Sequence, residues 1–211
     1  MMAVVTGTTA FGFGAPAGRI ALAAGAAALL SMGCFQLDHL FDLRKDQQGK
    51  RAANPFAAGT LSPRAGSFLI AGLLAGGAGL ALPLGWPALA CATAIVLVVA
   101  GLGVGILDGP IARAVSLGAL QGLYALLGGL SAGPARLGLW LTSVFLLLAM
   151  TGGRVLGDVR DRDADERAGT RTIPLCCGMR AAIAFLFVFE TLAYLAGAAM
   201  YLFGEIGRAH V

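Results

Sequence analysis

Two groups of aspartates in this sequence have the spacing expected of metal-binding carboxylates. The first group is Asp38, Asp42 and Asp46, and the second is Asp158, Asp161 and Asp165. Residues three, four or seven apart share one face of a helix, so each group places three carboxylates on one face. Like charges at this spacing repel one another and weaken the helix that carries them. Each group also follows directly on an apolar run.

Carboxylates in this arrangement point to chemistry with Mg²⁺ and a diphosphate. Mg²⁺ prefers oxygen ligands, and proteins usually hold it through a few carboxylates together with substrate phosphates. We therefore predict that the two groups meet at one mouth and bind a diphosphate through Mg²⁺. Basic side chains near them would contact the phosphates directly. These are Lys45, Lys50, Arg51 and Arg154. The alternative is a pair of solvated loops whose acids and bases neutralise each other.

Long apolar runs must position these groups, because the chain is 58% hydrophobic and only 12% charged. A helix that crosses a bilayer needs roughly 20 apolar residues. A shorter run, Met1–Ala15, precedes six runs of suitable length. The six are Ile20–Leu37, Ser67–Leu84, Ala88–Leu107, Ala114–Ala132, Leu137–Gly153 and Ala181–Phe203. We predict an all-α integral membrane protein, a multi-span helical bundle whose surface faces the lipid bilayer.

The order of the runs places both aspartate groups on one side of the membrane. Four crossings separate the groups, which returns the chain to its starting side. Basic residues concentrate in the loops on that side, whereas "PLGWP" has no charge and "SAGPAR" has only Arg136. The positive-inside rule then puts the aspartate-rich loops in the cytoplasm of the cell inner or plasma membrane. The net charge of +4 reflects this orientation, so we expect no nucleic-acid binding.

Small residues recur four apart within the apolar runs. Gly72 with Gly76, Gly101 with Gly105, and Gly118 with Gly122 are the pairs. In lipid, this spacing lets two helices approach closely. We expect these pairs to lie at helix–helix contacts.

At this point the chain resembles the UbiA superfamily of intramembrane prenyltransferases. The family's first motif reads N-D-x-x-D-x-x-x-D, and "DHLFDLRKD" fits that frame with Asp42 and Asp46 on the second and third aspartates. The second motif, D-x-x-D-x-x-x-D, is matched by "DVRDRDAD". The segments "NPFAAGTLSP" and "AGTRTIPLCCG" are similar to family loops that follow the two motifs. The resemblance covers nearly the whole chain.

The first motif departs from the family pattern at two positions. Asp38 stands where the family usually has Asn, and His39 stands where it has the first Asp. Either Asp38 supplies the missing carboxylate, or His39 binds metal or diphosphate, or His39 only packs at the helix end. Hard Mg²⁺ prefers oxygen to imidazole nitrogen. Arg113 could fill the place of a basic residue that the family often carries in a later loop.

The resemblance implies a Mg²⁺-dependent prenyltransferase. It would transfer an isoprenyl group from an allylic prenyl diphosphate to a lipophilic, often aromatic, acceptor in the membrane. Catalytic and metal-binding roles would fall to Asp42, Asp46, Asp158, Asp161 and Asp165, with Asp38 as a further metal ligand. Departure of the diphosphate would leave an allylic carbocation that the apolar walls shield from water. The acceptor, the prenyl length and the oligomeric state stay open.

The ends of the chain also depart from the resemblance. The family fold has nine helices, and about six plus the run Met1–Ala15 are present here, so we expect truncation at both ends. We expect residues 1–204 to form a single transmembrane helical domain. The terminal "EIGRAHV" can be encoded by GAGATCGGAAGAGCACACGTC, which reads like a sequencing adapter, so 205–211 are predicted to be a non-native tail. Whether such a chain is active by itself stays open.

Two other function classes compete with this interpretation. A CDP-alcohol phosphotransferase carries its aspartates in one compact motif, and this chain splits them between two distant loops. A small transporter or cation-binding membrane protein would place ionisable residues within the spans. Here Glu190 is the clear exception in spans that otherwise hold almost none.

Overall fold

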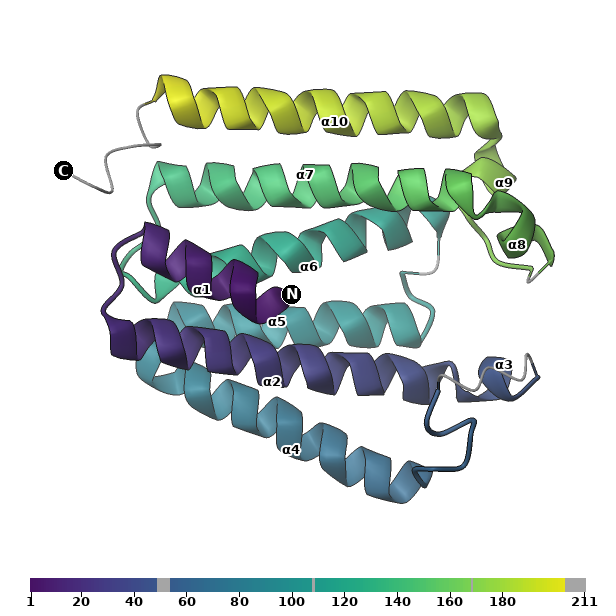
Figure 1. Ribbon diagram of the computed structural model, residues 1–211, viewed down its shortest axis with the longest axis horizontal. Coiled ribbons are helices and arrows are strands. Elements are labelled where there is room, and N and C mark those ends of the chain that lie inside the picture. Colours follow the sequence, from purple (N-terminus) through teal and green to yellow (C-terminus); the bar gives the residue numbers. More distant parts are fainter. Residues whose placement is uncertain (49–53, 108, 168, 204–211) are drawn as a thin grey trace.

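The computed structural model describes residues 1–48, 54–107, 109–167 and 169–203, and these residues form helices joined by short loops. The long helices lie side by side in one bundle, with α4 and α10 at opposite edges (Figure 1). The elements are α1 (Met2–Gly12), α2 (Ala17–Phe41), α3 (Leu43–Gln48), α4 (Pro63–Ala81), η1 (Leu82–Leu84), α5 (Trp86–Gly103), α6 (Pro110–Leu130), α7 (Leu137–Arg160), α8 (Arg162–Arg167), α9 (Ile173–Cys177) and α10 (Met179–Leu202).

Within the described residues, six helices are long and apolar enough to cross a membrane. They are α2, α4 with η1, α5, α6, α7 and α10, which confirms the predicted all-α membrane fold. Large apolar side chains on their outer faces are exposed, Phe187 and Tyr194 of α10 among them, as expected for a surface in lipid. The first apolar run forms the shorter helix α1.

Several predicted helix boundaries differ from the structure, and the ends of α5 and α7 are the two that bear on the site. α5 ends at Gly103 and does not continue to Leu107, because Gly105 adopts a φ of 80° and closes the helix C-terminus. α7 continues past Gly153 to Arg160. The polar residues of its last two turns stay helical because they lie at the bundle end, where their side chains reach polar surroundings. This extension carries Arg154 and Asp158 on the same rigid helix.

Helices α6 and α7 pack closely through the glycine pair Gly118 and Gly122. A Cβ on Gly118 would collide with Thr151 and with the carbonyl of Leu147, and one on Gly122 would lie 2.8 Å from the Ser143 carbonyl. The small-residue prediction is therefore confirmed for this pair. Gly72 and Gly105, in contrast, have open space where a Cβ would be.

The two aspartate groups lie at the same end of the bundle. α2 leads into α3 at this end, and α7 leads into α8 there (Figure 1). This arrangement agrees with the four crossings counted from the sequence. The N-terminus of α6, which carries Arg113, begins at this end as well.

Candidate active site

A polar cavity of about 470 Å³ opens between α2, α5, α6 and α7 at this end of the bundle. Its charged lining residues are Asp38, Asp42, Arg113 and Arg154, drawn from three of the four helices. The two guanidinium groups can donate hydrogen bonds to phosphate oxygens. The two carboxylates can bind a cation that the phosphate oxygens also bind. The cavity therefore brings together two of the three predicted acids of the first group and two of the predicted basic residues.

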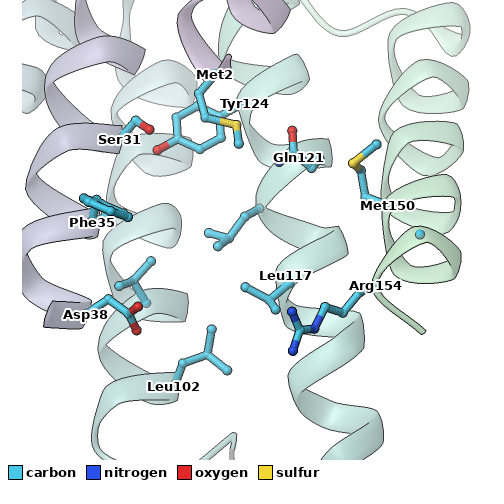
Figure 2. A pocket seen from close by; sticks show the side chains of 14 residues that line it. Met2, Ser31, Phe35, Asp38, Leu102, Leu117, Gln121, Tyr124, Met150 and Arg154 are labelled. Carbon is cyan, nitrogen blue, oxygen red and sulfur yellow. The ribbon is translucent and has the colours of Figure 1, made fainter. Parts of the chain in front are cut away.

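A second cavity of about 560 Å³, mostly apolar, continues from the polar one into the bundle. Four residues line both: Asp38, Leu102, Leu117 and Arg154. In Figure 2, Asp38 and Arg154 lie at one end of the apolar cavity, while Ser31, Gln121 and Tyr124 lie at the other. The two cavities thus form one continuous space with a charged mouth and an apolar interior.

Helix α2 ends within the first aspartate group, between Asp38 and Asp42. Asp42 is its C-cap, and the backbone N–H groups of Asp42 and Asp46 donate to the carbonyls of Asp38 and Asp42, each at 2.9 Å. The spacing of four therefore persists across the break between α2 and α3. Asp38 is exposed, Asp42 half-buried and Asp46 buried. Only the first two of these three line the polar cavity.

Asp46 is held by Asn54, a residue that the sequence reasoning did not single out. The Asn54 amide nitrogen donates to Asp46 Oδ2 at 2.9 Å and to the His39 carbonyl at 2.8 Å. Its amide oxygen accepts from the backbone N–H groups of Phe56 and Ala57. Asn54 is 1% exposed, so this fully bonded amide joins the end of α2, α3 and the following loop. Its place at the start of "NPFAAGTLSP", eight residues after Asp46, was the available signal.

His39 packs edge-on against Phe35, one turn earlier on α2, with ring centroids 4.4 Å apart. Asp38 lines the polar cavity, whereas His39 is not among its lining residues. This placement favours two of the predicted alternatives, namely Asp38 as the carboxylate and His39 as a packing residue.

The second aspartate group includes an ion pair between a buried carboxylate and a half-buried guanidinium. Arg154 Nη2 lies 2.9 Å from Asp158 Oδ1, one turn away on α7, and Asp158 is 4% exposed. Asp161 is the C-cap of α7 and accepts two hydrogen bonds from Arg160, at 2.7 and 2.8 Å. The hydrogen-bonded Arg160 guanidinium lowers the pKa of the exposed Asp161 carboxyl below its ordinary value. The Asp161 carboxylate is thus paired with Arg160 at the protein surface.

Arg113 joins the two groups electrostatically. It interacts with the carboxyl groups of both Asp38 and Asp158. The half-buried Asp165 also interacts with Asp158. One carboxyl of each group therefore lies within the electrostatic reach of Arg113, although Asp158 itself lines neither cavity.

The remaining predicted basic residues cannot be placed in the mouth. Lys45 lies in α3, but its side chain is outside the described part of the structure. Lys50 and Arg51 lie wholly outside the described residues.

The donor set fits Mg²⁺ shared with a substrate. Among the described residues, no three His, Cys, Asp or Glu side chains are grouped closely enough to hold a metal ion by themselves. Mg²⁺ is usually held by one or two carboxylates, waters and substrate phosphates. Asp38 and Asp42, with two arginines beside them in a polar cavity, provide such an incomplete oxygen site.

Comparison with known proteins gives matches at the level of family and of fold. The model of the UbiA prenyltransferase family matches residues 1–209. A search of curated proteins found no match.

Three solved structures are similar over nearly the whole chain. A digeranylgeranylglyceryl phosphate synthase has a TM-score of 0.82 at 19% identity, over 96% of this chain and 72% of that one. A UbiA homologue from Archaeoglobus fulgidus bound to GPP and Mg²⁺ has a TM-score of 0.80 at 17% identity, over 96% and 74%. An apo UbiA homologue from Aeropyrum pernix K1 has a TM-score of 0.79 at 22% identity, over 96% and 78%. At these identities, the likeness shows a common fold.

Proposed function

Because this chain belongs to the UbiA prenyltransferase family, we propose that it transfers an isoprenyl group from an allylic prenyl diphosphate to a lipophilic acceptor within the membrane. The observation that carries the proposal is the continuity of the charged and apolar cavities at Asp38, Leu102, Leu117 and Arg154. A prenyl diphosphate has the same division into a charged head and an apolar tail. The family match leaves the transporter and CDP-alcohol phosphotransferase alternatives without support.

The charged mouth would hold the diphosphate. Arg113 and Arg154 donate charge-assisted hydrogen bonds to its oxygens. Asp38 and Asp42, together with Asp158, would hold Mg²⁺ beside the diphosphate. When bound, Mg²⁺ would neutralise the negative charge of the diphosphate as the diphosphate leaves. The structure of the Archaeoglobus fulgidus homologue bound to GPP and Mg²⁺ supports a site for both ligands, without assigning residues to it.

The apolar cavity would hold the isoprenyl group next to the mouth. Its walls include Val99, Leu102, Leu117 and Leu120, which keep water away from the allylic carbon as the diphosphate departs. An electron-rich acceptor must reach that carbon in the same dry space. Asp46, Asp161 and Asp165 would tune the charge of the mouth, and Asp165 acts on Asp158 through like-charge repulsion.

We also propose that the charged end faces the cytoplasm and that residues 1–204 act as one transmembrane domain. The basic loop residues gather at this end, which agrees with the positive-inside rule. The predicted non-native segment, 205–211, lies outside the described residues.

Binding of geranylgeranyl diphosphate to the purified full chain in detergent tests the proposal. We expect saturable binding with Mg²⁺ and its loss on chelation with EDTA. Asp42→Asn and Asp158→Asn should each weaken binding about tenfold or more, since each removes a charge from the mouth. Asp163→Asn is the matched control, because Asp163 is exposed on α8, whereas Asp158 is buried beside Arg154. Mg²⁺-independent binding, or binding that neither substitution weakens, would overturn the proposal.

A further inference from the structure

The inner end of the apolar cavity is not uniformly apolar. Ser31, Gln121 and Tyr124 line it there, near the middle of helices α2 and α6 and away from the charged mouth (Figure 2). Two of these side chains satisfy each other, because Ser31 and Tyr124 are hydrogen-bonded. Their polarity therefore needs no ligand.

Gln121 differs from its two neighbours. It is 8% exposed and lines the cavity, yet its side chain makes no hydrogen bond to any residue that the structure describes. A primary amide carries two N–H donors and a carbonyl acceptor. Its amide faces the cavity, and leaving these groups without a partner in the apolar interior of a membrane protein is costly. A ligand that returns these hydrogen bonds would therefore bind favourably at this point.

An isoprenyl tail cannot be that ligand, because it has no hydrogen-bonding group. The acceptor is the other molecule that must enter the cavity. The charged lining residues of the apolar cavity are Asp38 and Arg154, and both lie at the opposite end (Figure 2). With no charge at the inner end, the matching group is neutral: a hydroxyl, which both donates and accepts, or a carbonyl.

The position of Gln121 suits an acceptor of the size of one or two fused rings. Arg113, Leu117 and Gln121 follow one another at intervals of four along α6 and lie on one face. Each interval is about 6 Å along the axis. A ring that meets Gln121 at one edge therefore reaches Leu117, where the charged mouth begins and the allylic carbon would lie.

We propose that Gln121 binds a neutral hydroxyl or carbonyl group of the prenyl acceptor and so orients the acceptor toward the charged mouth. This inference rests on the proposed prenyl transfer. It narrows the acceptor to a neutral, hydrogen-bonding lipophile and excludes a carboxylate at the inner end of the cavity.

Matched aromatic probes test the role of Gln121 without knowledge of the natural acceptor. The probes are 1-naphthol, 1-methylnaphthalene and 1-naphthoate, with a hydroxyl, a methyl and a carboxylate on the same ring. Binding to the full chain in nanodiscs, with Mg²⁺ and geranyl thiodiphosphate present, is measured by equilibrium dialysis against empty nanodiscs. We expect 1-naphthol to bind about tenfold more tightly than either other probe. In Gln121→Met this preference should vanish, while 1-methylnaphthalene and geranyl thiodiphosphate bind as before.

Leu123→Met is the control, because Leu123 is on the same helix but does not line the cavity, and it should keep the preference for 1-naphthol. Equal binding of 1-naphthol and 1-methylnaphthalene by the unaltered chain would overturn the inference, as would no saturable binding of either. Loss of geranyl thiodiphosphate binding in Gln121→Met would assign Gln121 to the fold or the mouth, which also overturns it. Failure of the unaltered chain to bind geranyl thiodiphosphate would instead refute the proposed transfer, on which the acceptor role depends.

Discussion

Arg154 and Asp158 form an ion pair of 2.9 Å on one helix, and the two partners face different surroundings. The Asp158 side chain is 5% exposed, whereas that of Arg154 is 39% exposed and lines both cavities. Asp158 therefore holds in place the guanidinium that would meet the diphosphate. The pair also offsets part of the cost of burying a carboxylate at the edge of an apolar bundle.

Arg154→Gln should lower both stability and diphosphate affinity. The substitution leaves the Asp158 carboxylate without its cation, and we expect a loss of about 1 kcal/mol in unfolding free energy after allowing for solvent screening of the exposed arginine. Geranylgeranyl diphosphate should bind about tenfold more weakly. Thermal unfolding in detergent and ligand titration measure the two effects. Arg160→Gln, which breaks only an exposed pair, is the control. Equal behaviour of the two variants would contradict the role of the buried pair.

Asn54→Ala should loosen the end of α2 and the position of Asp46. The amide makes four hydrogen bonds in a buried place, so we expect a loss of about 1–3 kcal/mol in unfolding free energy. Affinity for Mg²⁺ in the presence of geranylgeranyl diphosphate should fall as well. Thr60→Val, which removes an exposed hydrogen bond in the same loop, should change neither quantity. An unchanged melting temperature in Asn54→Ala would refute this view of the loop.

Much of this arrangement can be predicted from the sequence, because long apolar runs and regular aspartate spacing are strong signals. The six spans and the common side of the two aspartate groups follow from them, whereas the place of Arg113 came from the family resemblance. Asn54 and Gln121 are different, because each is one polar residue in an ordinary context. Their roles depend on which side chains meet after folding. The end of α7 was also missed, because hydropathy stops at Gly153 although the helix continues through polar residues at the membrane edge.

Gly118→Ala should separate α6 from α7. A Cβ there meets Thr151 and a backbone carbonyl that cannot rotate away, so we expect overpacking to cost about 1–3 kcal/mol. Because both helices line the cavities, prenyl-diphosphate affinity should fall with stability. Gly72→Ala, on an open face of α4, should leave the melting temperature unchanged or slightly raised. A Gly118→Ala chain as stable as this control would show that the close approach is not required.

Gly103→Ala should disturb the charged mouth from the side of α5. The ring of Phe41 lies against Gly103, and Asp42 follows Phe41 directly, so an added methyl group displaces the end of α2 that carries both cavity-lining aspartates. We expect weaker Mg²⁺-dependent diphosphate binding in titrations. Gly157→Ala, which has open space on α7, is the matched variant and should bind normally. Normal binding by Gly103→Ala would show that the mouth tolerates movement of Phe41.

The most direct test of the account is to find where a bound prenyl tail lies. Geranyl diphosphate with a diazirine at the end of its tail can be photocrosslinked to the full chain in nanodiscs and the labelled residues identified by mass spectrometry. The account predicts label on residues lining the apolar cavity, such as Val99, Leu117 and Leu120. It predicts that the label disappears with EDTA or in Asp42→Asn. Label on the outer face of α10, or label in the cavity that is indifferent to both Mg²⁺ and Asp42, would contradict it.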